Sequence, residues 1–579
     1  MTRPFCLLCL IWAALLSRPA LGDDATPFDD VSRDRLLVKV TDCLPPDFFV
    51  HTGEQPDAAK RPLVVEPLLE TLLAIDEQLD CRRVFRSPPR GWRHPAAAER
   101  VGLDRWLVVR FSRERIDLDE IVGTIVNLAG VETCERLIRG RVGDTVPNDP
   151  SFSSQWALQA GRLNAPGAWD IATDSSHVVA VIDTGADLDH TDLVDNLWQN
   201  PGEIAYNGID DDLNGFVDDV VGWDFAEDDN SPEDEYGHGI HVSGTVGARG
   251  NNNWMVSGVC WNVPIMVVRI LDDNGSGYPP EAAAGIVYAA DNGASVLNNS
   301  WGYTASFQVL EDAVRYSAAL DNVIVACAHN QGSSHKIYPA AYDEVMGIIA
   351  TDQSDQKPSW SNYGSWCDMA APGQDILSLW LFNGTTYGWG TSMATPHVAG
   401  AAALIREVNP FLDADATRWI LNQTAVDLGD PGFDDIFGWG RLDLFAAVEK
   451  ARSLIASSKS LSVNGGTVDF SLDAGSPNGG RDYLLLGTTS GYEPGTLLPG
   501  GLTTIPLNRD WFTDFVLARL NSPAFAGFWG RLDASGRSAA SLNAPKLNPL
   551  WAGTTIHFAY ATVNPWDYSS HAAALVIVP

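Results

Sequence analysis

The stretch VVAVID (178–183) is a short, almost continuous run of apolar residues that ends in an aspartate. A strand that is buried on both faces is expected to look like this, because neither face meets water. Four further runs of this kind follow along the chain: IMVVRIL (265–271), ASVLNNSWG (294–302), NVIVACAHN (322–330) and EVMGIIATD (344–352). Helical patterns at 280–293 and 306–320 separate several of these runs. The alternation predicts an α/β fold in which a parallel sheet carries helices on both faces.

Polar residues stand at the ends of three of the predicted strands. They are Asp183, the segment Asn298–Asn299–Ser300, and Asn330. In an open parallel sheet the carboxyl ends of the strands share one edge, and ligands bind beyond that edge. We therefore expect these residues to contribute to one functional site.

The predicted α/β domain covers residues 149–452, and the segments on either side of it differ in character. Residues 23–148 are richer in Arg and Pro, and they contain a strand, turn and helix (104–130) followed by a returning strand (131–140). This pattern predicts a small α/β unit, either a propeptide or an unrelated N-terminal domain. Residues 461–579 alternate apolar and polar residues and show no helical pattern, which predicts an antiparallel, β-sandwich-like domain. For that domain we expect a role in surface attachment, binding or stability.

The N-terminus has the features of a secretory signal peptide. Arg3 precedes an apolar run over residues 5–16, and Ala20 and Gly22 have the small-residue spacing of a cleavage site. The apolar run is shorter than a bilayer-spanning helix requires, and no later segment is long and apolar enough, so no membrane span is expected. We predict that residues 1–22 are removed and that the protein is secreted, outside the cell or into the periplasm.

The net charge of the 579-residue chain is strongly negative, because 38 Lys and Arg stand against 74 Asp and Glu, a net of −36. This charge argues against nucleic acid or an anionic membrane surface as a partner, and it favours binding of cations. Of the eight cysteines, Cys6 and Cys9 lie in the signal peptide, and the other six divide three and three on either side of residue 150. Their pairing stays open, and none has the spacing of zinc ligands.

A possible nucleophile begins the stretch GTSMATPHVAGAAALI (390–405), where Ser392 stands at the start of a helical apolar pattern. A serine nucleophile needs a base, an acid that orients the base, and donors for the oxyanion. His238 in EYGHGIHVSGT (235–245), Asp183 and the amide of Asn330 can supply these functions. Each of these residues alone is more often a helix cap, a turn former or a structural residue. Their joint occurrence in one chain favours nucleophilic catalysis.

The region from about 150 to 450 resembles the subtilisin-like serine proteases, or subtilases. VIDTG, GHGIHVSGT and GTSMATPHVAGAAALI are similar to the aspartate, histidine and serine motifs of that family, in the same order. The resemblance implies that His238 is the base, that Asp183 orients it and that Ser392 is the nucleophile. Asn330 falls where the family has its oxyanion amide.

The function implied by this resemblance is that of a secreted serine endopeptidase that hydrolyses protein or peptide substrates through an acyl-enzyme. Subtilases carry an inhibitory propeptide that is removed by self-cleavage, so residues 23–148 are expected to be the protein's own propeptide, cut within 139–150. The alternative is a non-catalytic binding protein on a subtilase scaffold, with the C-terminal β domain as its working part.

Two positions near the catalytic motifs depart from the family pattern. Ile240 stands where the histidine motif usually has Thr, and His329 stands where the segment before Asn330 usually has Gly. By the same resemblance, His329 and Ile337 border the pocket for the side chain that precedes the scissile bond, opposite a wall of three residues: Trp301, Gly302 and Tyr303. One hypothesis is that the two bulky side chains make this pocket shallower than that of subtilisin. The alternative is that shifts of the backbone absorb both side chains.

An acidic segment, NGIDDDLNGFVDDVVGWDF (207–225), predicts a structural calcium site. Oxygen-bearing side chains recur around a glycine, Gly215, as a hard and flexible cation site requires. The predicted ligands are Asp210, Asp212, Asn214 and Asp219. The alternative is a solvated acidic loop. A second calcium site is implied only by the family resemblance, with Asp192 and Asn252 as ligands, joined by Gln155.

Overall fold

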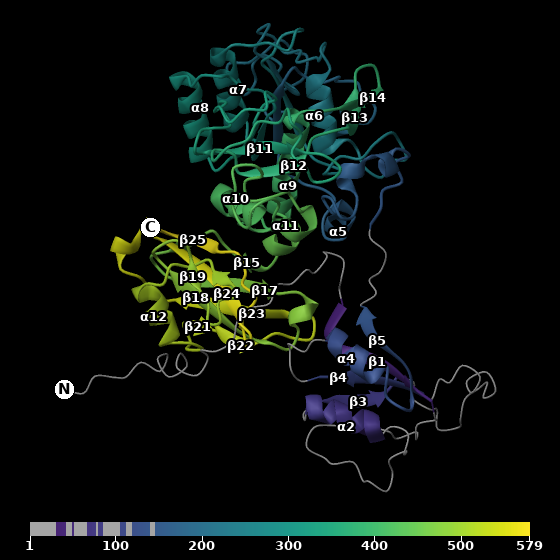
Figure 1. Ribbon diagram of the computed structural model, residues 1–579. Helices are drawn as coiled ribbons and strands as arrows, with labels where there is room; N and C mark the ends of the chain where they lie inside the picture. Colours follow the sequence, from purple (N-terminus) through teal and green to yellow (C-terminus); the bar gives the residue numbers. More distant parts are fainter. Residues whose placement is uncertain are drawn as a thin grey trace. The chain divides into compact units, whose positions relative to one another are not determined.

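The computed structural model describes residues 31–41, 49–50, 66–76, 79–84, 105–111, 118–138 and 145–579 (Figure 1). The predicted signal peptide and residues 139–144 lie outside these ranges. The chain divides into two compact units, one within residues 19–143 and the other from residue 144 to the C-terminus. In the described ranges, no helix is both long enough and apolar enough to cross a bilayer.

The described residues of the N-terminal unit form an antiparallel sheet and two helices. The strand order is β2-β3-β4-β1-β5. Its elements are β1 (Val31–Val40), β2 (Phe49–Val50), α2 (Glu66–Ile75), β3 (Asp80–Arg83), β4 (Trp106–Arg110), α4 (Leu118–Ile125) and β5 (Val131–Ile138). Apolar side chains from both helices and the central strands form one buried cluster, in which Leu36, Leu72 and Ile125 are fully buried. The strand, helix and returning strand predicted over 104–140 correspond to β4, α4 and β5.

A seven-stranded sheet forms the centre of the second unit, in the order β12-β11-β10-β9-β6-β8-β7, and all neighbouring strands are parallel. The strands are β6 (Val179–Asp183), β7 (Gly222–Asp224), β8 (Ile265–Arg269), β9 (Val296–Asn299), β10 (Val323–Cys327), β11 (Val345–Thr351) and β12 (Met369–Pro372). The predicted parallel sheet is confirmed.

Helices cover both faces of this sheet, as predicted. Alternate residues of each strand point to opposite faces, so that Val179 and Val181 pack in one apolar cluster and Ala180 and Ile182 in the other. The first cluster holds α6 (His238–Gly247) and α9 (Thr391–Val408), and the second holds α7 (Pro279–Asp291) and α8 (Gln308–Ala319). Further elements of this region are α5 (Ala165–Trp169), α10 (Ala414–Gln423), α11 (Leu444–Ala451), and the hairpin of β13 (Ile376–Trp380) and β14 (Gly384–Gly388).

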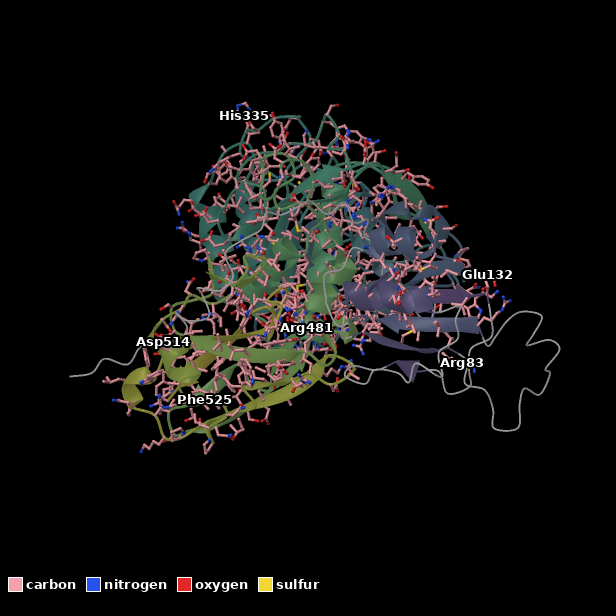
Figure 2. The ribbon with its side chains drawn as sticks, turned by 60° about the horizontal axis from the view of Figure 1, so that its bottom comes forward. Arg83, Glu132, His335, Arg481, Asp514 and Phe525 are labelled. Atoms are coloured by element: carbon pink, nitrogen blue, oxygen red, sulfur yellow. The ribbon has the colours of Figure 1, made fainter. Side chains whose placement is uncertain are left out.

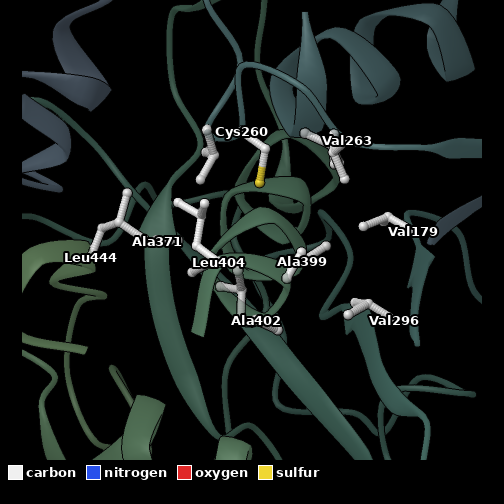
Figure 3. Packing of buried hydrophobic residues seen from close by; sticks show 14 of the residues in the cluster. Val179, Cys260, Val263, Val296, Ala371, Ala399, Ala402, Leu404 and Leu444 are labelled. Atoms are coloured by element: carbon white, nitrogen blue, oxygen red, sulfur yellow. The ribbon is translucent and has the colours of Figure 1, made fainter. Parts of the chain in front are cut away.

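Helix α9 is almost entirely buried, which explains its small side chains. Figure 3 shows Ala399, Ala402 and Leu404 of this helix surrounded by apolar side chains from other elements. The Cys260 thiol donates to the carbonyl of Gly400 at 3.4 Å. The three cysteines of this region, Cys260, Cys327 and Cys367, are all buried free thiols.

The C-terminal region is rich in β-structure. One sheet has the order β15-β17-β23-β21 and the other β16-β25-β24-β18-β22. The strands are β15 (Leu454–Ala456), β16 (Ser460–Ser462), β17 (Gly466–Asp473), β18 (Asp482–Thr488), β21 (Phe525–Ala526), β22 (Trp529–Arg531), β23 (Arg537–Ala544), β24 (Thr555–Val563) and β25 (Ala573–Val578), with a separate hairpin of β19 (Thr496–Leu497) and β20 (Thr504–Ile505). Side chains from both sheets share one apolar cluster, as in a sandwich.

Two features of the C-terminal region differ from the sequence prediction. The pair β16–β25 is parallel, whereas the other pairs are antiparallel. A helix, α12 (Trp511–Leu517), stands where none was expected, and a capping box of Asp510 and Thr513 begins it. Asp514 of this helix and Phe525 of β21 are labelled in Figure 2, and the ring of Phe525 packs at 5.9 Å on that of Phe515.

Candidate active site

Asp183 and His238 form a direct hydrogen-bonded pair. Asp183 ends β6 and is fully buried, and its Oδ1 accepts from the backbone N–H of Thr184 at 2.8 Å. His238 is the first residue of α6, and its Nδ1 lies 2.6 Å from the same oxygen. The Thr184 hydroxyl accepts from the N–H of Gly239 at 2.8 Å, so strand end and helix start are joined at two points. The bond to Asp183 fixes the Nδ1 side of the imidazole ring and leaves Nε2 available to accept or donate a proton.

Two carboxylates set the charge state of His238. Burial opposes charging of its imidazole, but Asp183 and then Asp234 raise the pKa of His238 above its usual value. The nearby His241 is different, because burial and the charge of His238 lower its pKa to about 4. His241 lies 3.0 Å through Nε2 from the carbonyl of Ile376, so it serves as a structural link, as predicted from the motif.

Ser392 is the second residue of α9, where backbone N–H groups have no acceptor within the helix. Its hydroxyl donates to the carbonyl of Ser300 at 3.0 Å, and the Ser300 hydroxyl donates to the carbonyl of Ser392 at 2.9 Å. Across residues 145–579, no side chain or carbonyl hydrogen-bonds His238 Nε2. Helices α6 and α9 pack against each other, which brings base and serine to the same edge of the sheet.

Asn330 follows β10, and its side chain is anchored on one side only. Its Oδ1 accepts from the N–H and the hydroxyl of Thr391 at 2.9 and 3.0 Å. Its Nδ2 has no acceptor in the described part of the chain, and it lies beside Gly390, at 3.2 Å from the position of a Cβ there. Gly390 has a φ of 145°, which residues with a side chain avoid. An unpaired amide donor therefore stands next to the first turn of α9.

The five predicted pocket residues lie around the same edge of the sheet, but two of them, Trp301 and Ile337, are buried in the protein interior. Trp301 is buried and donates to the carbonyl of Ile182 at 2.8 Å, and Ile337 is only 1% exposed. A Cβ on Gly302 would lie 2.4 Å from Ile337 Cγ2, so Ile337 crowds this glycine, whereas it would lie 3.9 Å from His329 Cδ2, an ordinary van der Waals contact. The Tyr303 hydroxyl donates to the carbonyl of Gly277 at 3.2 Å.

His329 adopts a left-handed backbone conformation with a φ of 77°, which a glycine would adopt more easily. Two hydrogen bonds hold it there. Its N–H donates to the Thr391 hydroxyl at 2.8 Å, and its Nδ1 accepts from the N–H of Asn330 at 3.0 Å. Burial lowers the pKa of His329.

Comparison with known proteins identifies the architecture. The sequence profile of the subtilase family matches residues 174–440. Thermitase from Thermoactinomyces vulgaris is 38% identical over 304 residues, which cover 52% of this chain and 99% of that protein. The chain belongs to the subtilase family. It is a subtilisin-like serine protease, and therefore a hydrolase.

Two further relatives match the same half of this subtilase. Subtilisin Savinase from Lederbergia lenta is 35% identical over 298 residues, which cover 51% of this chain and 98% of that protein. A halolysin-like extracellular serine protease from Natrialba magadii is 35% identical over 307 residues, which cover 52% of this chain and 53% of that protein.

In the acidic segment of this subtilase, two of the predicted ligands, Asp212 and Asp219, lie together with Glu203, which was not predicted. Each of the three places an oxygen within 4.8 Å of the others. Asp210 is not in this group, and its oxygens accept from the N–H groups of Asn214 and Gly215 at 3.1 and 2.9 Å. Spacing within 207–225 could not reveal Glu203, which lies before that segment.

Asp219 is the buried member of this group. It accepts from the Tyr288 hydroxyl at 2.6 Å, from Asn200 Nδ2 at 2.9 Å and from Asn214 Nδ2 at 3.0 Å. Burial raises the pKa of Asp219, and the charge of Asp212 raises it further against these three hydrogen bonds. Negative charge is thus concentrated at a site where it is poorly compensated.

Asp192 and Asn252, which the family resemblance pairs, lie together in the structure. Asn252 Nδ2 donates to Asp192 at 2.7 Å, whereas both side-chain atoms of Gln155 bind the backbone of Ser257, at 2.7 and 2.8 Å. Asp149 lies next to the pair and accepts from the N–H of Asn252 at 3.2 Å. Burial raises the pKa values of Asp149 and Asp192, and the charge of Asp149 adds to the rise at Asp192.

Proposed function

We propose that this chain is a secreted serine endopeptidase in which Asp183, His238 and Ser392 form the catalytic triad. The observation that carries the proposal is the 2.6 Å bond between His238 Nδ1 and Asp183, on a base whose Nε2 is free. The similarity to the extracellular serine protease from Natrialba magadii and the N-terminal signal pattern support secretion.

In the proposed reaction, the Ser392 hydroxyl leaves the Ser300 carbonyl and gives its proton to His238 Nε2 as its oxygen attacks the substrate carbonyl. Asp183 holds the imidazole in the correct tautomer and stabilises the imidazolium. The oxyanion accepts from Asn330 Nδ2 and from the N–H of Ser392, both near the positive end of the α9 dipole. His238 then protonates the leaving amine, and water hydrolyses the acyl-enzyme by the same steps.

The N-terminal unit is proposed to be an inhibitory propeptide that the enzyme removes by cutting itself within residues 139–150. A sheet of parallel strands that are distant in sequence folds slowly, so a folding template is useful. The test is the mass of the secreted protein, wild type against Ser392→Ala. The wild type should lose roughly 120 residues, the size expected of the N-terminal unit, and the variant should keep them. If both proteins keep the unit, self-processing is wrong and the non-catalytic binding protein becomes the better hypothesis.

We propose that the substrate pocket is shallow. Ile337 crowds Gly302, and His329 lies within van der Waals distance of it and is held by two hydrogen bonds. Peptides with Ala before the scissile bond should therefore be cleaved with higher kcat/KM than the same peptides with Phe. A clear preference for Phe would contradict this and favour a backbone shift that opens the pocket.

Calcium is the proposed structural cofactor, at two sites. Glu203, Asp212 and Asp219 would hold one ion, and Asp192 with Asp149 would contribute to the other, because hard oxygen ligands suit Ca²⁺. The fit is supported by the burial of Asp219, Asp192 and Asp149, which raises the pKa of each carboxyl group and so disfavours its charged form. Calcium would neutralise these carboxylates and tie their loops to the sheet, and it takes no part in the reaction.

Calcium binding is tested by thermal unfolding with and without the chelator EGTA. At a calcium concentration of 100 times Kd, one bound ion stabilises the folded state by about 2.7 kcal/mol. The unfolding temperature should fall on chelation, and Asp219→Asn should remove part of that fall. An unchanged unfolding temperature would mean a solvated acidic loop.

A further inference from the structure

A second buried carboxylate lies close to the catalytic histidine. Asp234 is four residues before His238 and is 3% exposed. Its Oδ1 accepts from the N–H groups of Tyr236 and Gly237 at 3.0 and 2.8 Å, and its Oδ2 accepts from the N–H of Ile240 at 2.9 Å. The three amides lie on both sides of His238 in the chain. One carboxylate thus binds the backbone before and after the base.

We propose that Asp234 is a positioning residue for the base of this protease, because its carboxylate clamps the turn that carries His238 and keeps the imidazole on Asp183. The inference rests on the proposed role of His238 as the base. It concerns a residue outside the triad, which reaches the reaction only through His238.

Asp234 is not the N-cap residue of its helix. Asp443 and Asp413 are the N-cap residues of α11 and α10, and each caps its helix by accepting from one backbone N–H, that of Ala446 or Ala416. The N-cap of α6 is Gly237, which has no side chain and a φ of 97°. Asp234 therefore supplies the cap from outside the helix, and it also binds the turn that precedes it. The two oxygens of the Asp234 carboxylate therefore fix the two ends of the segment 236–240 relative to each other.

Asp234 also contributes to the electrostatics around the base. The titratable groups that face His238 are Asp183 from β6, Asp234 from the preceding loop and His241 from α6. His241 is neutral near neutral pH, so the two carboxylates dominate. Both favour the imidazolium that forms when Ser392 is deprotonated. Burial raises the pKa of Asp234, while hydrogen bonds from Gly237 and Ile240 oppose that rise.

The test compares Asp234→Asn with a matched control, Asp443→Asn. Asp443 is also a buried capping carboxylate whose pKa burial raises, but it stands at the start of α11 and does not face His238. The measurements are the pH profile of kcat/KM, the separate values of kcat and KM, and an NMR titration of the His238 imidazole in the purified secreted protein.

Asp234→Asn should lower kcat by about 10- to 100-fold with little change in KM, as expected for a misplaced base. The acid limb of the pH profile and the NMR pKa of His238 should both move to lower pH, because a neighbouring negative charge is lost. Asp443→Asn should lower thermal stability without either change. Asp234→Glu, which keeps the charge but displaces the clamp, should lower kcat without the pKa shift.

Equal kcat and an equal His238 pKa in Asp234→Asn and Asp443→Asn would overturn the proposal. If Asp234→Asn does not fold, Asp234→Glu decides through kcat, and an unchanged kcat there would overturn it as well. A wild-type protein without peptidase activity would refute the proposed function instead. The NMR titration would still report whether Asp234 acts on His238, so the two failures can be distinguished.

Discussion

Removal of the Asn330 amide is the sharpest test of how this site stabilises the oxyanion. The side chain has two separate tasks, because Oδ1 binds Thr391 and Nδ2 faces the first turn of α9 without an acceptor in the described chain. Asn330→Ala loses both interactions. Of the two, only the hydrogen bond from Nδ2 becomes stronger as negative charge develops on the substrate oxygen. In subtilisin, loss of one such donor costs about 10²- to 10³-fold in kcat, or about 2.7–4 kcal/mol.

The anchoring task can be tested with Thr391→Val. This variant removes the hydrogen bond from the Thr391 hydroxyl to Asn330 Oδ1, and also the one that this hydroxyl accepts from the N–H of His329, and it keeps the amide donor. A neutral hydrogen bond contributes about 0.5–1.5 kcal/mol, so loss of the bond to Asn330 accounts for a fall in kcat of about 2- to 13-fold. The assay is steady-state hydrolysis of a chromogenic peptide, with kcat and KM determined separately. KM should change little in both variants, since the donor acts in the transition state.

The two variants together separate donation from anchoring. If Asn330→Ala loses no more kcat than Thr391→Val, Asn330 does not donate to the oxyanion and the reasoning is refuted. If Asn330→Ala raises KM and leaves kcat unchanged, the amide binds substrate rather than the transition state.

Three further predictions follow from the same structure. Only neutral His238 can accept a proton, and Asp183 raises the pKa of His238. We therefore expect kcat/KM to fall with decreasing pH, with its midpoint above the usual histidine pKa of about 6.5. A midpoint below that value would contradict the electrostatics described above. Ile337→Gly should raise kcat/KM for Phe before the scissile bond by at least about tenfold relative to Ala, because it frees space beside Gly302; equal gains for both peptides would argue against a steric block. Asp510→Ala should destabilise the C-terminal region by about 1–2 kcal/mol in urea unfolding. Burial opposes ionisation of Asp510, but hydrogen bonds from Thr513 and neighbouring groups lower its pKa, so this contribution is present above the unfolded pKa of about 3.9 and is lost as pH falls below it.

The sheet could be predicted where its strands are long and buried on both faces. Val179–Asp183 and Val345–Thr351 are continuous apolar runs, and periodicity alone identifies them. The strand β7 could not be predicted, since its three residues, Gly222–Asp224, are too few to establish a pattern. Helix α12 could not be predicted for a related reason. It has only seven residues, and its start is marked by an Asp510–Thr513 capping box rather than by an apolar repeat.

In the candidate site, too, the residues that could be predicted are those identified by their neighbours in the sequence, and the others could not be predicted. Each residue of the proposed triad stands in a motif whose neighbours fix its own backbone, as Gly390 does beside Ser392, so the sequence identifies it. Glu203, Asp149 and Asp234 stand in no such motif, because loops bring each of them to its partners. Burial opposes the charge of Asp149 and Asp234, and Glu203 lies close to two other carboxylates. A chain with a net charge of −36 has many carboxylates, and a buried or crowded one is retained at low cost only where its charge is compensated, by amides at Asp234 or by the proposed cation beside Glu203. Among the many acidic residues of such a chain, the functional ones are therefore recognised by how their charge is balanced, which only the fold determines.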